Sequence, residues 1–176
     1  HFTDGRYGLH AVFSPRLLAE GNRLSRTGTG IVVLYSPALT LRGNHIAHAL
    51  TDGGAGIVLK DSHDSLIEGN EVLHCAVGLK LDTGVEGLGQ LQVRGNHFAH
   101  NLIGMFFYGE AGQDHFSGNR YTNNLIGLQL NVPLFAGGYV NASVRQTLAG
   151  LERAEQTLEA GRRTLGLQVH KEFRGV

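Results

Sequence analysis

Apolar side chains occupy every second position in short segments that recur along this chain. These segments are Leu9-Ala11-Phe13, Ile31-Val33-Tyr35, Leu39-Leu41, Leu79-Leu81, Leu91-Val93 and Leu128-Leu130. A two-residue period is typical of β-strands, whose successive side chains point to opposite faces, whereas an amphipathic helix repeats about every 3.6 residues. The pattern therefore predicts a chain built mainly from short strands.

The dipeptide Gly-Asn occurs five times and sets a basic period of 22 residues. Short insertions near residues 52–55, 84–89 and 109–114 lengthen single repeats. A fixed period with local insertions is the signature of a solenoid, whose repeats stack while its loops project outward. We predict one internal ladder formed by Asn22, Asn44, Asn70, Asn96 and Asn119. Asparagine suits this place because it tolerates a left-handed turn and its amide can bond to the next rung.

Three short strands separated by turns fit into 22 residues, so the predicted fold is all-β, a right-handed parallel β-helix solenoid over residues 1–132. A leucine-rich repeat has a similar length, but it needs more leucines and a helical segment in each repeat. In this register the chain starts in the middle of a rung, which predicts a fragment of a longer solenoid with room for an upstream signal peptide.

Residues 133–176 follow the last repeat and form a predicted C-terminal extension with an α-helix over about 141–165. Asn141 or Ser143 is a suitable N-cap. Apolar residues at helical spacing are Val144, Leu148, Leu151, Ala154, Leu158 and Leu165. Such a helix either packs on the last rung and hides its open edge or docks on a partner.

The outward positions of the first strand in each rung are unusually apolar. They include Val12, Val32, Leu34, Val58, Phe106 and Tyr108. An exposed apolar stripe of this kind marks a surface that another element covers. The stripe is therefore a candidate partner-binding surface, with the C-terminal extension as an alternative cover.

Composition narrows the classes of function. The chain has 15 Lys and Arg against 15 Asp and Glu, with no basic stripe for nucleic acid and no apolar run long enough to span a membrane. The single cysteine, Cys75, excludes an internal disulfide framework. One surface column alternates in sign, and we expect cross-strand ion pairs along it; its members are Glu20, Arg42, Glu68 and Arg94.

The candidate metal ligands are three histidines and the cysteine. Four residues after successive asparagines stand His48, His74 and His100, and Cys75 follows the middle histidine. Imidazole and thiolate are ligands for both copper and zinc. The alternative is a row of turn residues without a ligand, since Arg26 and Asn123 continue the same column and side chains on adjacent parallel strands need not converge.

Acidic residues suggest a second possibility. Many β-helix proteins cleave or epimerise acidic polysaccharides with clustered carboxylates. Here Asp61, Asp64 and Asp82 fall on two neighbouring rungs, with Lys60 in the column of Asp82. Solvated turn residues that cap the local backbone explain the same pattern.

Three segments show a resemblance to a known family: Arg6-Tyr7-Gly8-Leu9-His10-Ala11-Val12-Phe13-Ser14, Gly30-Ile31-Val32-Val33-Leu34-Tyr35-Ser36, and Gly56-Ile57-Val58-Leu59-Lys60-Asp61-Ser62 with Ile67-Glu68-Gly69-Asn70. They resemble NosD, the periplasmic maturation protein of nitrous oxide reductase, over about residues 3–130. The resemblance implies a non-enzymatic protein that helps deliver copper together with an ABC transporter's ATPase and permease and a copper chaperone. The family pattern has Met-Tyr-Ser where this chain has Val12-Phe13-Ser14 and Leu34-Tyr35-Ser36. The rival function is that of a polysaccharide lyase, an epimerase or a carbohydrate-binding β-helix.

Overall fold

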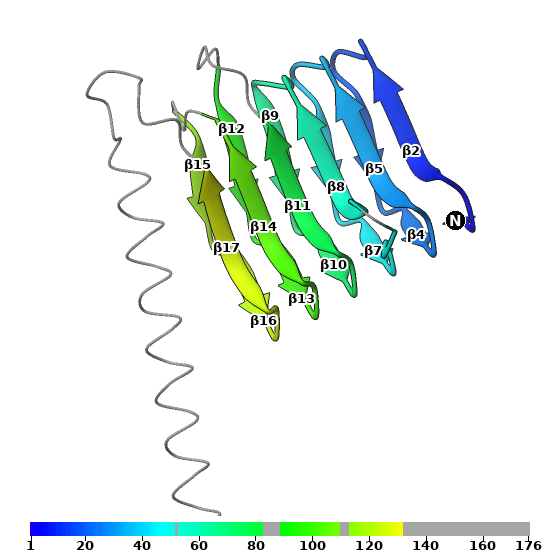
Figure 1. Cartoon of the computed structure of the whole chain (residues 1–176). Coiled ribbons are helices and arrows are strands. Elements are labelled where there is room, and N and C mark those ends of the chain that lie inside the picture. Colours follow the sequence, from blue (N-terminus) through cyan, green and yellow to red (C-terminus); the bar gives the residue numbers. More distant parts are fainter. Residues whose placement is uncertain (52, 83–88, 110–112, 132–176) are drawn as a thin grey trace, which may run out of the picture.

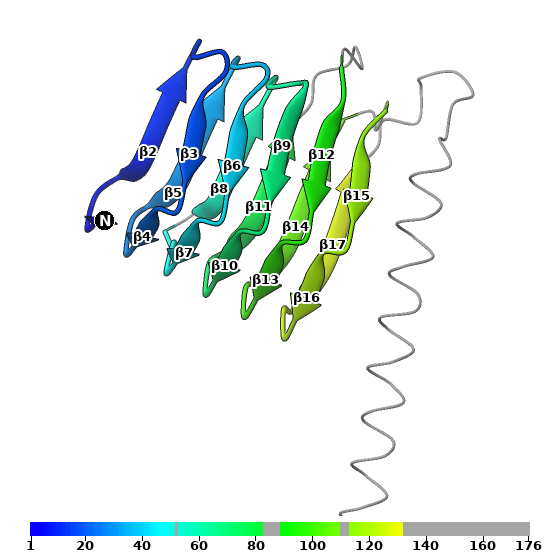
Figure 2. The ribbon, with the colours of Figure 1, turned by 180° about the vertical axis from the view of Figure 1, so that it is seen from behind.

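Three parallel sheets run side by side along one stack of rungs in the computed structural model (Figure 1). The structure describes residues 1–51, 53–82, 89–109 and 113–131. Sheet A contains β1 (Phe2–Thr3), β4 (Arg23–Ser25), β7 (His45–Ala47), β10 (Glu71–Leu73), β13 (His97–Ala99) and β16 (Arg120–Thr122). Sheet B contains β2 (Tyr7–Val12), β5 (Thr29–Leu34), β8 (Ala55–Lys60), β11 (Val77–Asp82), β14 (Ile103–Tyr108) and β17 (Ile126–Asn131). Sheet C, seen from behind in Figure 2, contains β3 (Leu18–Glu20), β6 (Thr40–Arg42), β9 (Ser65–Glu68), β12 (Leu91–Arg94) and β15 (His115–Ser117).

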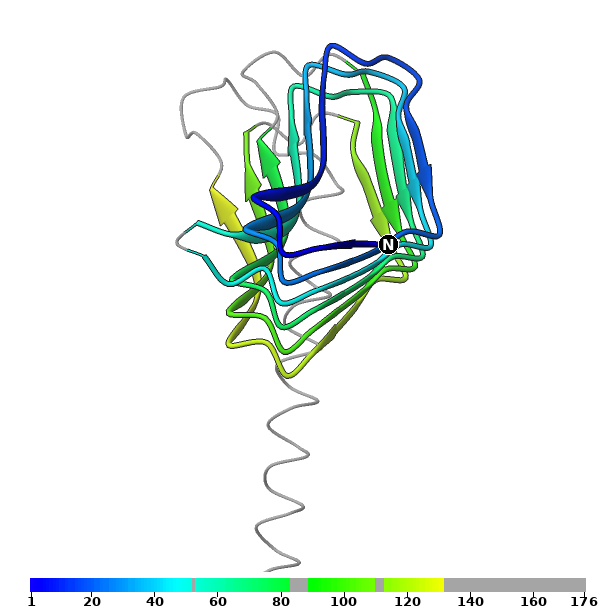
Figure 3. The ribbon, with the colours of Figure 1, turned by 90° about the vertical axis from the view of Figure 1, so that its right-hand side faces the viewer.

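Along the described chain, five rungs each contribute one strand to every sheet, and β16 and β17 extend sheets A and B by one more strand, so the predicted parallel β-solenoid is confirmed. The register keeps equivalent residues in line, as where Val72 pairs with both Ile46 and Phe98. The rungs therefore follow nearly the same path when the stack is viewed from its end (Figure 3). The same register holds at the first strand, where Phe2 pairs with Leu24.

The core lies between the three sheets and is filled by aligned apolar columns. Fully buried members include Leu24, Ile46, Val72 and Phe98 from sheet A, Ile31, Ile57, Leu79 and Met105 from sheet B, and Leu41, Ile67 and Val93 from sheet C. Burying a side chain of this size contributes about 1.5–3 kcal/mol. Adjacent rungs approach closely at Gly78 on β11, where an added Cβ would lie 2.3 Å from the carbonyl oxygen of Gly104 on β14 and 3.0 Å from the ring of Phe98 on sheet A. Only glycine permits this approach.

The turns differ from the prediction in one respect. The glycine of each Gly-Asn pair takes the left-handed conformation, as Gly95 does with φ of 64°, whereas the five predicted ladder asparagines have no positive φ. Our expectation that asparagine suits this place because it tolerates a left-handed turn is therefore wrong. Glycine reverses the chain without a Cβ clash, and the following asparagine is left free to point inward.

The predicted C-terminal helix, and the domain boundary at residue 132, lie outside the described residues. Within the part that is described, no helix has both the length and the hydrophobicity needed to cross a bilayer. The described stack of rungs holds all the candidate functional residues discussed below.

Candidate functional site

The asparagine column forms a continuous internal ladder. The side-chain amide of each asparagine donates to Oδ1 of the next, at 3.0 Å from Asn22 to Asn44 and 2.9 Å for each of the next three steps, through Asn70 and Asn96 to Asn119. Each Oδ1 also accepts the backbone N–H of the preceding asparagine. Buried polar groups are stable only when paired in this way. The ladder is thus a structural feature of the core.

Cys75 belongs to a second internal column, apart from the histidines. Its N–H donates to Oδ1 of Asn101 at 2.8 Å, and the Asn101 amide donates to Asn124 at 3.1 Å. The thiol contacts the carbonyl oxygen of Leu73 at 3.2 Å, and burial raises its pKa to about 11. A protonated, enclosed thiol is a poor metal ligand. The structure therefore separates Cys75 from the neighbouring His74.

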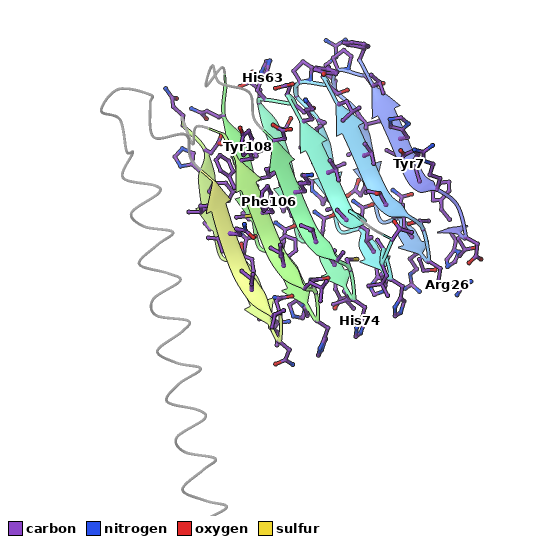
Figure 4. The ribbon with its side chains drawn as sticks, in the orientation of Figure 1. Tyr7, Arg26, His63, His74, Phe106 and Tyr108 are labelled. Carbon is purple, nitrogen blue, oxygen red and sulfur yellow. The ribbon has the colours of Figure 1, made fainter. Side chains whose placement is uncertain are left out.

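The three candidate histidines form a stacked column on the outer edge between sheets A and B, where His74 is labelled in Figure 4. Ring centroids are 5.1 Å apart between His48 and His74 and 5.0 Å apart between His74 and His100, with interplanar angles of 5° and 11°. All three have positive φ, which turns these exposed side chains away from the core. Arg26, which closes one end of the column, pairs with Asp4 at 2.8 Å.

These histidines offer donors that suit copper, but parallel rings do not direct their lone pairs at one point. A ring nitrogen binds a metal along its lone pair in the plane of the imidazole. Among residues 1–51, 53–82, 89–109 and 113–131, no group of three or more His, Cys, Asp or Glu side chains is arranged to hold a metal ion. The column thus presents separate one-nitrogen donors, without the geometry of a closed chelate.

Two further histidines on sheet A contact charged side chains of the same chain. Nδ1 of His45 lies 2.8 Å from the Glu71 carboxylate, and Nδ1 of His97 lies 3.6 Å from its other oxygen. A guanidinium nitrogen of Arg120 is 3.1 Å from the same nitrogen of His97. These contacts engage Nδ1 of both rings, and Nε2 of His97 also lies 3.2 Å from the Thr122 hydroxyl.

The apolar stripe covers much of the outer face of sheet B, where Figure 4 labels Phe106 and Tyr108. Val12 and Tyr108 are exposed, while Leu34, Val58 and Phe106 are partly buried. Val32 is only 8% exposed, so the prediction of an exposed side chain is wrong at this position. It pairs in register with His10 and Val58, and these flanking side chains shield it. The stripe is therefore uneven, and it is interrupted at β11, where Lys80 lies in register between Val58 and Phe106.

The candidate catalytic acids engage local partners. Asp82 pairs with Lys60 at 3.8 Å across adjacent rungs of sheet B. Asp64 accepts the backbone N–H of Gln90, and this bond, together with His63, lowers its pKa. The Asp64 contact matches the interpretation of the acids as residues that cap the local backbone, whereas Asp82 forms a cross-strand ion pair on β11.

Other ladders carry no obvious signal in the sequence. Ser14 and Ser36 donate their backbone N–H groups to the hydroxyls of Ser36 and Ser62, at 2.9 and 3.1 Å. Asp114 accepts the N–H of Leu91 at 2.9 Å in a buried corner. Serine and aspartate are common in turns, so only the aligned register shows that these side chains point inward. By contrast, the surface column of alternating charge was predicted from the sequence, and its ion pairs are present. Glu68 contacts Arg42 at 3.1 Å and Arg94 at 2.8 Å.

A solenoid with internal polar ladders and exposed side-chain columns defines the class of the protein as a parallel β-helix repeat protein. Residues 1–133 match the family model described as periplasmic copper-binding protein (NosD), and the chain belongs to this family. The predicted resemblance to NosD is thereby confirmed. A second model, described as outer membrane efflux protein, matches residues 101–174, less than half of the chain. No curated protein and no solved structure matches the chain.

Proposed function

We propose that this chain is a periplasmic, non-enzymatic maturation factor that helps deliver copper to nitrous oxide reductase. The match of residues 1–133 to a periplasmic copper-binding family carries the proposal. Besides the reductase, the proposal includes two further partners. The ATPase and permease of an ABC transporter would act on the solenoid from the membrane, and a copper chaperone would supply the ion. Copper is cargo in this scheme.

The stacked column His48, His74 and His100 is the candidate contact for copper. Its imidazoles are exposed and repeat at about 5 Å, so each can act as a single donor to an ion that a chaperone still holds. Incomplete coordination favours transfer over storage, because a single imidazole binds copper more weakly than a closed set of ligands does. Cys75 is left out of this role because its thiol is buried.

The outer face of sheet B is the candidate docking surface for the transporter. Val12 and Tyr108 are exposed, and the side chain of Lys80 lies 6.0 Å from the Phe106 ring centre. Aromatic and aliphatic anchors with a polar border are typical of protein interfaces. A polysaccharide lyase or epimerase is less well supported, because Asp82 and Asp64 already have local partners.

Calorimetry with Cu(I) and Cu(II) tests the copper contact. We expect uptake by the parent chain and its loss in the variant His48→Ala/His74→Ala/His100→Ala. The matched control His45→Ala/His97→Ala alters two sheet A histidines and should retain uptake. Equal uptake by the triple variant and the parent would exclude the column as the contact.

Co-purification tests the transporter separately. The double variant Phe106→Ser/Tyr108→Ser should lose the permease while it keeps copper uptake. Binding of acidic oligosaccharides, with no uptake of copper, would instead support the carbohydrate-binding alternative.

A further inference from the structure

An open groove lies at the corner between sheets A and B, along the first three rungs. Its volume is about 670 Å³, and ligand sites in proteins typically measure about 300–1,000 Å³. We call it the corner groove. The side chains that line it include Asp4, Arg6, Arg26, His48, Leu50 and Thr51.

The corner groove adjoins the imidazole column. Asp4 and Arg26 precede His48 on the two rungs before it, and all three have the left-handed backbone conformation that turns the column outward. Figure 4 labels Arg26 and His74 along this edge. His48 lines the groove and also stacks on His74, with ring centroids 5.1 Å apart. A ligand in the groove therefore lies beside the first imidazole of the column.

Hydrogen bonds within the chain set the shape of the groove. Gly28 donates its N–H to the carbonyl oxygen of Gly5, and the Thr51 hydroxyl donates to the carbonyl oxygen of Gly28, both at 3.0 Å. Thr51 thus fastens the start of the third-rung insertion to the second rung. The neighbouring Leu50 remains 64% exposed. The groove is therefore formed before any ligand binds, and it has an apolar side chain at its border.

Two guanidinium groups give the corner groove its charge. Arg26 donates to both carboxylate oxygens of Asp4, from Nε at 2.8 Å and from Nη2 at 3.1 Å. Arg6 has no acidic partner within the described residues, and its guanidinium carbon lies 5.2 Å from the centre of the Tyr7 ring. A guanidinium fork matches the two oxygens of a carboxylate. Arg6 is therefore a positive charge that the described chain does not neutralise.

A buried hydroxyl in the lining also lacks a partner. Thr27 lines the groove and is 3% exposed, and its hydroxyl makes no hydrogen bond in the described part of the chain. Most buried hydroxyls in folded proteins are paired. The lining thus contains both a charge and a hydrogen-bonding group that the chain leaves unsatisfied.

From these features we infer that the corner groove binds a short acidic segment of a partner protein. A carboxylate of the segment pairs with Arg6 and with the remaining donors of Arg26, and an apolar side chain of the segment covers Leu50. A small free anion would neutralise the same charge but would leave the leucine exposed. The bound segment lies next to His48, so it places the partner at one end of the imidazole column. Binding requires no copper, so the inference is independent of the proposed copper transfer.

Fluorescence anisotropy on the full metal-free chain tests the groove. The probe is a labelled, end-capped peptide of alternating aspartate and leucine, and the matched probe has asparagine in place of aspartate. We expect the acidic probe alone to bind. Arg6→Gln should weaken its binding about tenfold, the effect of losing one charge-assisted pair. The control Arg23→Gln changes an exposed arginine on sheet A and should leave the affinity unchanged.

Asp4→Asn should act in the opposite direction. It removes the internal carboxylate that competes for Arg26, so the acidic probe should bind several-fold more tightly. Equal binding of the asparagine probe, or equal losses in Arg6→Gln and Arg23→Gln, would overturn the assignment. Binding of citrate without binding of the peptide would also overturn it and leave the groove to a small anion.

Discussion

The asparagine ladder and the imidazole column repeat on the same rungs, yet they have opposite environments. Asn70 is 1% exposed and bonds to both neighbouring asparagines, whereas His74 is exposed and only stacks on His48 and His100. Stacking identical rungs multiplies whatever each column contains, because equivalent residues recur about every 4.8 Å. An inward column therefore adds a stabilising contact at every rung. An outward column repeats the same exposed side chain at every rung.

The largest effect should come from breaking the inner column. Asn70→Ala leaves the N–H of Asn44 and the carbonyl oxygen of Leu41 without their partner, which we expect to lower the free energy of unfolding by about 1–3 kcal/mol. His74→Ala on the same rung should change it by less than about 0.5 kcal/mol. Urea unfolding at matched m-values measures both. Equal losses would contradict the contrast between the two columns.

Asp114 is the charged exception among the inward groups. Burial raises the pKa of its carboxyl to about 6, although the N–H of Leu91 and the nearby His115 oppose that shift. The folded state therefore holds this proton more tightly than the unfolded state, so stability falls as pH rises from about 4 to 6. Asp114→Asn should stabilise the protein by about 1–2 kcal/mol at neutral pH and by much less below pH of about 4.

Unfolding curves of Asp114→Asn and the parent across this pH range provide the measurement. The neutral amide keeps an acceptor for the N–H of Leu91, so the comparison isolates the charge. A constant difference between the two proteins at all pH values would exclude titration of Asp114 as the cause.

In the outer histidine column, the free energy of unfolding should depend more on the backbone conformation than on the side chains. His74 has φ of 52°, a left-handed conformation that glycine adopts without a steric penalty. His74→Gly should therefore raise the free energy of unfolding by up to about 1 kcal/mol. The midpoint of thermal unfolding reports this change, with Gly95→Ala as the reciprocal control. A clear loss of stability in His74→Gly would show that the stacked rings themselves support the fold.

The smallest effect is expected on the outer face of sheet C. Glu68→Gln removes the ion pairs to Arg42 and Arg94, each partly exposed, and should cost about 0.2–0.5 kcal/mol. Salt screens such pairs, so the difference should vanish near 1 M ionic strength, at a Debye length of about 3 Å. Chemical unfolding at low and high salt checks this, and a larger loss that persists in high salt would contradict a surface ion-pair role.

The repeating rungs could be predicted because their signals are local features of the sequence. Gly-Asn repeats and alternating apolar positions indicate stacked strands, and the column that holds Lys60 and Asp82 follows by counting residues. The turn at each Gly-Asn pair depends on the left-handed conformation that glycine adopts without a steric penalty. The family resemblance rested on the same segments.

The tertiary structure determined which way each side chain points and which residues it contacts. His74 and Cys75 are adjacent in the chain, but the left-handed turn sends the imidazole outward while the thiol points inward. Val32 looks exposed by alternation, yet His10 and Val58 shield it from the two flanking rungs. Sequence by itself determined the columns, because a repeat aligns equivalent residues. Only the packed stack decided which atoms in those columns are buried, paired or accessible, because these properties depend on rungs that lie more than 20 residues away in the chain.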